Sequence, residues 1–199
     1  MPCTKNTPRC KKEHGEKGFL IVPECCREKT RELLYFTVEL FEKNNIDYWL
    51  DYGTLLGAVR EGGFFNHDED VDISTFIENR EKIENLKEEF LKEGYVVKLD
   101  HFKRKSGIQI RYSKENNLHI DIFFWYNFDG LLRRTCYVRG DEYKGMDFPK
   151  EWVETTKGIK FENKSLRVPK NPERFCEFRY GITWKIPMSP FAYNSQYKK

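Results

Sequence analysis

Residues 48–74 read YWLDYGTLLGAVREGGFFNHDEDVDIS, and this stretch decides the fold. An apolar run at 46–50 predicts a short buried strand, and Gly53-Thr54 then opens a helix that extends to Arg60. A strand-to-helix junction leaves backbone N–H groups without helical partners, and the helix dipole favours an anion beside them. Because glycine also lets a ligand approach the backbone closely, Gly53 and Thr54 are predicted to bind a phosphate.

Four acidic residues follow within positions 68–72, after a glycine-rich connector. In an extended strand alternate residues share a face, so Asp68, Asp70 and Asp72 lie together while the intervening apolar side chains enter the core. Carboxylates so close repel one another unless a cation lies between them, and oxygen ligands suit Mg²⁺ or Mn²⁺. A solvated acidic turn is the alternative, but the alternation with apolar residues favours a metal site.

A third carboxylate is supplied by the run LHIDIFF at 118–124, which is rich in β-branched and aromatic residues. Asp121 is the single acid of this predicted strand, and it shares a face with His119 and Phe123. We therefore expect Asp121 to complete the metal site. The alternative is that Asp121 pairs with a buried arginine or lysine.

The composition limits the class of protein. With 199 residues, 39% apolar and 16% aromatic residues, the chain is predicted to form one domain, or a domain with a small appendage. The formal charge of +3 argues against nucleic acid as the main partner. No apolar run reaches the roughly 20 residues that span a bilayer, and the first residues lack the apolar core of a signal peptide. The expectation is a soluble, cytoplasmic chain, or one from the secretory pathway if it is an excised domain.

Four of the six cysteines lie near the N-terminus, at Cys3, Cys10, Cys25 and Cys26. Four thiols from a loop and a helix start would suit a tetrahedral zinc site, and such a site would explain how so polar a segment is ordered. Free thiols and extracellular disulfides are the alternatives. We divide the chain into a Cys-containing N-terminal segment, 1–26, and a catalytic domain, 27–199.

The remaining sequence alternates helical and strand patterns. Charged helices with an apolar stripe are predicted at 25–43 and 78–93, strands at 95–99, 108–112 and 118–124, and a capped helix at 172–180. This order indicates an α+β fold, a mixed sheet with helices packed on one face. The two cysteines outside the N-terminal segment, Cys136 and Cys176, are expected in the core. Several basic residues of the second half are possible phosphate or substrate contacts, although a structural role is commoner: Arg133, Arg134, Arg139, Arg174, Arg179 and Lys185.

Three blocks resemble the LicD family of nucleotidyltransferase-fold enzymes. The family motif Trp-Leu-x-x-Gly-Thr-Leu-Leu-Gly-Ala-x-Arg followed by Asp-x-Asp-x-Asp is matched at 49–60 and 68–72. A later Ile-Asp-Ile strand is matched at Asp121, and a closing Val-Pro, Tyr-Gly, Trp and Pro pattern at 168–187. Together the blocks span nearly the whole chain, and the resemblance implies a nucleotidyltransferase (polymerase-β-like) fold.

The resemblance also implies a reaction. Members of this family move a phosphorylated alcohol, such as phosphocholine or ribitol 5-phosphate, from a CDP-activated donor to a glycan or glycoconjugate hydroxyl, releasing CMP. Asp70 and Asp72 are then expected to hold Mg²⁺ or Mn²⁺, with Asp121 as third ligand or as the base for the acceptor's proton. Gly53 and Thr54 would cradle the phosphate, and Arg60 would add a fixed positive charge.

Two alternatives stay open at this point. A true nucleotidyltransferase would attach NMP from an NTP to a small alcohol or sugar, with the same metal site. A non-enzymatic relative would keep the fold as a binding module, although the intact acids weigh against it. Donor head group, acceptor and oligomeric state are not readable from the sequence.

The resemblance bears on two further features. In the fukutin-related branch of the family, a Cys-x6-Cys and a later Cys-Cys pair form a zinc-binding loop just before the first long helix. The similar spacing here implies zinc at the four N-terminal cysteines. The chain departs from the family at His67, which stands where the family usually has tryptophan, and His67 is not placed in the catalytic set.

Overall fold

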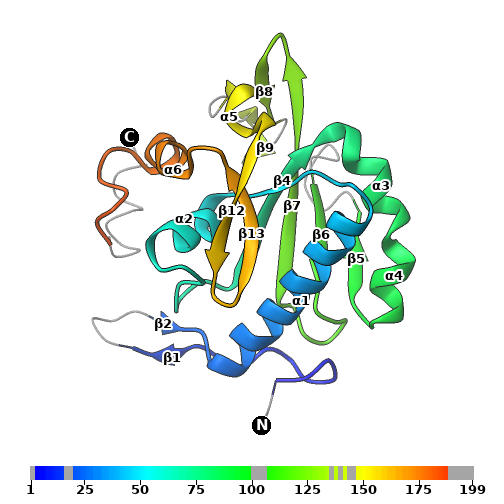
Figure 1. Cartoon of the computed structure of the whole chain (residues 1–199). Helices are drawn as coiled ribbons and strands as arrows, with labels where there is room; N and C mark the ends of the chain where they lie inside the picture. The colour runs from blue at the N-terminus through cyan, green and yellow to red at the C-terminus, as the bar shows by residue number, and fades with distance from the viewer. Residues whose placement is uncertain are drawn as a thin grey trace.

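A computed structural model describes residues 3–15, 20–99, 107–134, 137–138, 141–142 and 147–187. A seven-stranded sheet lies at the centre of the described residues, with helices beside it and three separate two-stranded pairs, β1-β2, β9-β10 and β12-β13 (Figure 1). The described elements are β1 Glu13–His14, β2 Leu20–Ile21, α1 Glu24–Lys43, β3 Trp49–Leu50, α2 Tyr52–Arg60, β4 Asp70–Phe76, η2 Ile77–Asn79, α3 Arg80–Asn85, α4 Lys87–Lys92, β5 Val96–Lys98, β6 Gly107–Arg111, β7 His119–Phe128, β8 Leu131–Arg133, β9 Tyr137–Val138, β10 Asp141–Glu142, β11 Phe148–Pro149, α5 Glu151–Glu154, β12 Thr156–Phe161, β13 Lys164–Pro169 and α6 Pro172–Tyr180.

The sheet runs in the order β11-β8-β7-β4-β3, and β6 also pairs with the long strand β7 and carries β5 at its other edge. The β4–β7 pair is parallel, whereas the other pairs of this sheet are antiparallel. The predicted mixed sheet is therefore confirmed. The parallel pair matters most, because it brings the two acidic segments of the sequence side by side.

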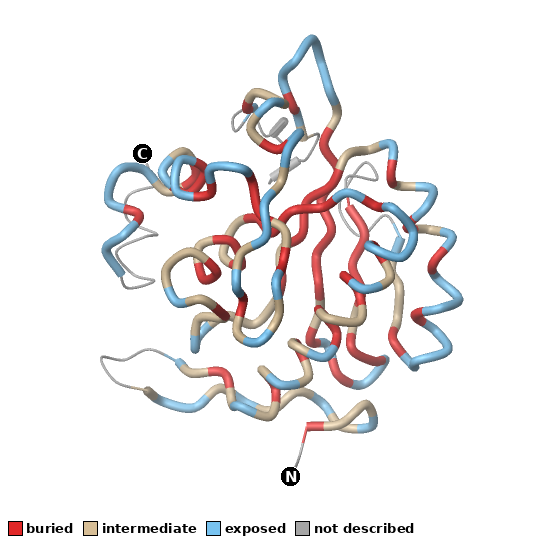
Figure 2. Tube along the Cα trace, in the orientation of Figure 1, coloured by how far each residue is buried: buried red, intermediate tan, exposed pale blue. Residues whose placement is uncertain are grey.

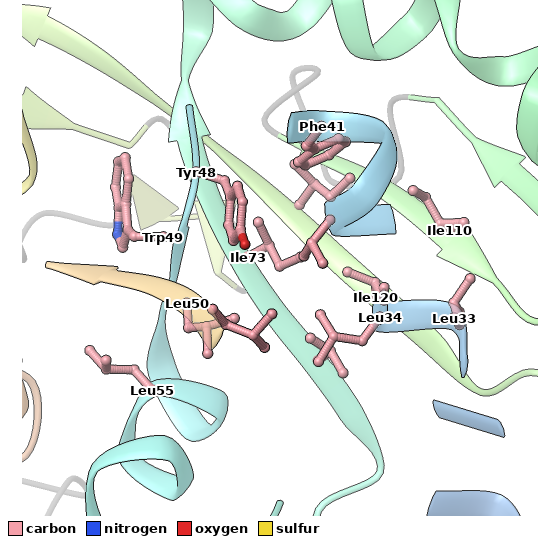
Figure 3. Close-up of a cluster of buried hydrophobic side chains, with 14 of the residues drawn as sticks. Leu33, Leu34, Phe41, Tyr48, Trp49, Leu50, Leu55, Ile73, Ile110 and Ile120 are labelled. Atoms are coloured by element: carbon pink, nitrogen blue, oxygen red, sulfur yellow. The ribbon is translucent and has the colours of Figure 1, made fainter. Parts of the chain in front are cut away.

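One face of the sheet is apolar and covered by α1. Ile73, Ile110 and Ile120 are fully buried, and Figure 3 shows them facing Leu34 and Phe41 of that helix. Strand residues alternate between faces, so the acidic side chains of β4 and β7 lie on the opposite face. The period-two pattern in the sequence thus separates the core from the site.

Helix α1 buries residues that recur every three or four positions, as an amphipathic helix requires: Cys26, Thr30, Leu33, Leu34, Thr37, Val38 and Phe41. Its outer face is exposed (Figure 2). Phe36 of α1 also meets Phe90 of α4, with ring centroids 5.6 Å apart. Both helices therefore cover the same face of the sheet.

The predicted helix at 78–93 is divided in the structure. It becomes the 3-10 turn η2 followed by α3 and α4. The division falls at Leu86, where ψ is −1° and the backbone N–H donates to the Ile83 carbonyl, three residues back, at 3.1 Å. Gly94 follows α4 with φ +77°, a conformation that glycine adopts readily. The predicted stop at Gly94 is confirmed, and the continuous helix is not.

Helix α6 has the predicted bounds. The Asn171 side chain accepts a hydrogen bond from the backbone N–H of Arg174, Pro172 occupies the first turn, and Gly181 ends the helix. Its buried Cys176 confirms the expectation of a core cysteine, whereas Cys136 and Arg139 lie outside the described residues. Docking of α6 brings the late part of the chain to the side of α2.

Candidate active site

The parallel register of β4 and β7 builds an acidic cluster. Asp70 lies opposite His119, and Asp72 lies opposite Asp121. His119 Nε2 is 3.8 Å from Asp70 Oδ2 and 3.8 Å from Asp121 Oδ2, and one ligand atom of each of these three residues lies within 4.8 Å of the others. The structure brings together the predicted pair Asp70 and Asp121, and it adds His119, whose shared face with Asp121 was visible in the sequence.

Two further carboxylates crowd this cluster. Burial, followed by the charge of Asp70, raises the pKa of Asp68 to about 7. The pKa of Asp72 is raised well above its usual range by burial and then by Asp70, Asp68 and Asp121. Asp68 precedes β4, so it reaches the cluster from a loop and not from the strand. Carboxylates that resist ionisation in this way have the charge environment that a divalent cation would relieve.

A second row of polar contacts orients Asp121. Gln109 of the neighbouring strand β6 lies opposite Asp121, and its Nε2 donates to Asp121 Oδ1 over 3.0 Å. The Arg111 Nε donates in turn to Gln109 Oε1 at 2.6 Å, which fixes the orientation of the amide. Sequence reasoning missed both residues, although Gln109 and Arg111 are polar side chains that alternate with isoleucines in the predicted strand 108–112.

The first turn of α2 is held against the acidic strand. The Asp51 N–H donates to the Asp72 carbonyl at 3.1 Å, and the Asp72 N–H donates to the Thr54 hydroxyl at 2.9 Å. A side chain at Gly53 would place its Cβ 3.0 Å from Asp68 Oδ2, so glycine permits this close approach. The roles of Gly53 and Thr54 as phosphate contacts stay predictions, while their structural role is to fix the helix N-terminus beside the carboxylates.

A buried ion pair lies behind this turn. Arg179 of α6 donates to both carboxylate oxygens of Asp51, at 3.1 and 2.7 Å, and neither side chain is more than 1% exposed. Asp51 also accepts from Ser74 at 2.7 Å, and Ser74 accepts from Trp125 at 2.9 Å. The sequence left Arg179 as a possible substrate contact and did not single out Asp51. The structure gives this arginine an internal partner.

Arg60 lies at the other end of α2. Eight residues separate it from Tyr52, so about 12 Å of helix lies between them. Its guanidinium lies over the Phe65 ring at 4.9 Å, and His67 stacks on the same ring at 5.3 Å. Burial lowers the pKa of His67, as do the charges of Lys12 and Arg60. The role of Arg60 as a fixed positive charge for the substrate stays a prediction.

Residues 45–171 match a family model described as LicD/FKTN/FKRP, nucleotidyltransferase domain. The chain belongs to the LicD family. It is 28% identical over 190 residues to "Ribitol 5-phosphate transferase FKRP" of Homo sapiens, covering 90% of this chain and 38% of that protein. It is also 28% identical over 174 residues to "Ribitol-5-phosphate transferase FKTN" of Mus musculus, covering 85% and 36%. The chain thus spans a little over a third of the length of these relatives.

A solved structure supports the fold. The lincosamide antibiotic adenylyltransferase LnuA, bound to lincomycin, aligns with a TM-score of 0.51 at 20% identity, covering 76% of this chain and 87% of that one. At this identity the likeness concerns the fold alone, and it confirms the predicted nucleotidyltransferase fold of the α+β class. Among the described residues of this LicD-family chain, no helix is long and apolar enough to cross a membrane.

The four N-terminal thiols of this LicD-family chain lie together. Cys3 Sγ is 3.6 Å from Cys26 Sγ, and Cys10 Sγ is 3.6 Å from Cys25 Sγ. The ligand atoms of Cys3, Cys10 and Cys26 all lie within 4.8 Å of one another, and burial raises the pKa of the Cys26 thiol. The Asn116 amide donates to Cys3 Sγ at 3.0 Å. Cys3, Cys10 and Cys26 thus converge as predicted, and Cys25 adjoins the group through Cys10. Zinc itself stays a prediction.

The N-terminal segment contacts the acidic loop directly. Arg9 and Lys12 both form ion pairs with Glu69, the residue between Asp68 and Asp70. The Val22 N–H donates to the Asn66 carbonyl at 2.7 Å. The thiol cluster and the acidic cluster are therefore neighbours, joined through residues 66–69.

Proposed function

We propose that this chain transfers a phosphorylated alcohol, either phosphocholine or a polyol phosphate such as ribitol 5-phosphate, from a CDP-activated donor to a glycan hydroxyl, releasing CMP. The observation that carries the proposal is the β4–β7 register, which sets Asp70 and Asp72 opposite His119 and Asp121 beside the N-terminus of α2. Two relatives, which are named as ribitol 5-phosphate transferases, agree with this proposal.

The residues present fit a divalent cation. Asp70, Asp72 and Asp121 offer carboxylate oxygens, the ligands that Mg²⁺ and Mn²⁺ prefer. Burial and then the neighbouring carboxylates raise the pKa of Asp72, and a cation would offset both effects. His119 adds an imidazole within 3.8 Å of two of these acids. A bound cation would supply Lewis acidity and neutralise charge on the donor's diphosphate.

The side chains themselves suggest how the transfer proceeds. The acceptor oxygen forms a bond to the alcohol-bearing phosphorus while the bond from that phosphorus to the CMP oxygen breaks. We assign the acceptor's proton to Asp121, because Gln109 fixes that carboxylate and His119 lies beside it. The backbone N–H groups at Gly53 and Thr54 would hold a phosphate oxygen through the helix N-terminus.

We also propose that Cys3, Cys10, Cys25 and Cys26 bind one structural zinc ion. Zn–S bonds of about 2.3 Å place ligand sulfurs roughly 3.8 Å apart. Two of the Sγ–Sγ distances here are 3.6 Å, and the ligand atoms of Cys3, Cys10 and Cys26 lie within 4.8 Å of one another, while Cys25 would join as the fourth ligand from beside Cys10. The segment has little apolar material of its own, so the ion would stabilise its fold.

The test of the reaction is a donor panel. The protein is incubated with Mg²⁺, a mixture of oligosaccharides and, in separate reactions, CDP-ribitol, CDP-glycerol, CDP-choline or CTP, and CMP and pyrophosphate are separated by chromatography. We expect CMP from one CDP-alcohol. Pyrophosphate from CTP, without CMP from any CDP-alcohol, would instead establish a nucleotidyltransferase.

A matched pair of variants completes this test. Asp70→Asn removes one charge from the site and should abolish CMP release. Asp129→Asn removes one charge at the exposed turn between β7 and β8, where φ is +50°, a conformation that asparagine tolerates. This control should release CMP like the unaltered protein. Equal activity of both variants would contradict the proposed site.

A further inference from the structure

Two adjacent arginines at the end of β8 have different surroundings. The Arg133 side chain is 51% exposed, pairs with Asp147 at 2.8 Å and lies over the Phe128 ring. Arg134 is half-buried, and its Nη1 donates to the Tyr52 hydroxyl at 2.8 Å. The Arg134 guanidinium lies 4.1 Å from the centroid of the Phe123 ring. Consecutive residues on an extended strand point to opposite sides, which explains the contrast.

The partners of Arg134 place it beside the acidic cluster. Phe123 follows Asp121 by two residues on the same face of β7, roughly 7 Å along the strand. Tyr52 begins α2, immediately before the predicted phosphate-binding turn, and its ring meets Phe123 at 5.2 Å. Burial raises the pKa of the Tyr52 phenol; the charge of Arg134 lowers this pKa and the charge of Asp72 raises it, so both groups lie near the phenol. The guanidinium therefore lies where the first turn of α2 meets the acidic face of the sheet.

We propose that Arg134 binds the diphosphate of the donor. The inference rests on the proposed function and adds a binding residue to it. A guanidinium presents a planar fork of donors that matches phosphate oxygens. Stacking on Phe123 and the bond to Tyr52 fix its plane before a ligand arrives, so little freedom is lost on binding.

Charge and position favour Arg134 over the other arginines described near the site. Arg179 is buried and bonded to both oxygens of Asp51, and Arg111 orients Gln109. Arg60 is separated from the first turn of α2 by the length of that helix. A diphosphate approaching a group of carboxylates needs a fixed cation nearby, and Arg134 meets that need from the helix side of the site.

Calorimetry with CDP and with cytidine, each in Mg²⁺, tests the inference. Arg134→Gln should weaken CDP binding about tenfold or more, the scale of a lost hydrogen bond to a charged group. Its affinity for cytidine should not change, and Arg134→Lys should recover part of the CDP affinity. Arg133→Gln is the matched control and should bind CDP normally. Circular dichroism and melting curves establish that each variant is folded.

The possible results separate two failures. If the unaltered protein binds CDP and Arg134→Gln binds it equally well, the inference is wrong while the proposed function stands. If Arg134→Gln weakens CDP and cytidine equally, the residue shapes the nucleoside site and does not contact the diphosphate, so the inference is again wrong. If the unaltered protein binds no CDP, the proposed donor itself is wrong.

Discussion

The acidic cluster and the thiol cluster each gather several potential metal ligands, but the chain assembles them in different ways. Asp70, Asp72 and Asp121 are set by the register of two buried parallel strands. The thiols come from a coil at Cys3 and Cys10 and from the first turn of α1. The strands have a hydrophobic core behind them, whereas the described part of the coil is held by the short β1–β2 pairing, by the ion pairs with Glu69 and by single hydrogen bonds such as that from Asn116 to Cys3.

This difference indicates what a metal would do in each place. The sheet fixes the carboxylates whether or not an ion is present, so their mutual repulsion is imposed by the fold, and a cation would serve binding and chemistry. The thiol segment has few buried apolar side chains, of which Cys3 and Val22 are examples, so a cation there would serve folding.

The largest effect is expected at the acidic cluster. Asp72→Asn should lower CMP release by about a thousandfold or more, the scale of losing a charged contact to the transition state. Its melting temperature without added divalent cations should not fall, because the substitution removes a repelled charge. Donor turnover and thermal melting provide the two measurements. A variant that is both inactive and unstable would show that Asp72 supports the fold, which would break the contrast between the clusters.

The second prediction concerns the frame behind the site. Arg179→Met leaves the buried Asp51 carboxylate without its bidentate partner, which should cost about 3–5 kcal/mol of folding stability. Urea unfolding measures the loss. Arg167→Met is a suitable control, because Arg167 forms an exposed pair with Asp47. If the two variants were equally stable, the acidic cluster would not depend on a rigid buried frame.

The sequence predicted the helices and strands of the molecule better than the side-chain contacts between them. The alternation around Asp70 and Asp72 specified one strand, and the single acid of 118–124 specified its neighbour, because burial of one sheet face forces a period of two. Asn171, Pro172 and Gly181 likewise specified α6 through local capping chemistry. Such signals lie within a few residues of one another.

The contacts that escaped prediction join distant segments. Asp51 and Arg179 are 128 residues apart, and Gln109 meets Asp121 only because β6 and β7 form a hairpin in that register. The sequence named Arg134 only as one of several possible phosphate contacts, because its bond to the Tyr52 hydroxyl depends on the return of β8 along β7. The role of Arg60, which the family motif contains, stays a prediction. Tertiary pairing, which no local pattern encodes, decides these cases.

The third prediction tests the thiol cluster. Cys26→Ser should remove zinc from the protein, as measured by atomic absorption, and should make the N-terminal segment sensitive to trypsin at Arg9 and Lys12. The rest of the chain should stay resistant, because its core does not depend on the ion. Cys176→Ala, which alters a buried cysteine of α6, should retain zinc. Unchanged zinc content in Cys26→Ser would refute the proposed site.

The fourth prediction concerns pH. The folded-state pKa of Asp68 is about 7 and its ordinary value is 3.8, so the folded protein holds a proton that the unfolded chain releases between these values. Without divalent cations, this group should therefore make folding stability fall as the pH rises from about 4 to about 7. Asp68→Asn should flatten that part of the profile and raise the melting temperature at pH 7. Melting curves between pH 4 and pH 7 test this prediction. If Asp68→Asn had the same pH dependence of stability as the unaltered protein, Asp68 would not be the titrating group.

The smallest effect is expected where the two clusters meet. Glu69→Gln removes the ion pairs with Arg9 and Lys12, which are partly exposed and should contribute only about 0.2–1 kcal/mol. If the two clusters are structurally independent, Glu69→Gln should leave the zinc content unchanged and should change the affinity for CDP only slightly. If residues 66–69 transmit order from the thiol segment to the carboxylates, Glu69→Gln should weaken Mg²⁺-dependent CDP binding while zinc stays bound. Glu154→Gln, which removes an exposed helical pair with Lys150, provides the control for charge alone. If Glu69→Gln lost much of its affinity for CDP and Glu154→Gln did not, the thiol segment would also set the geometry of the carboxylates on β4 and β7.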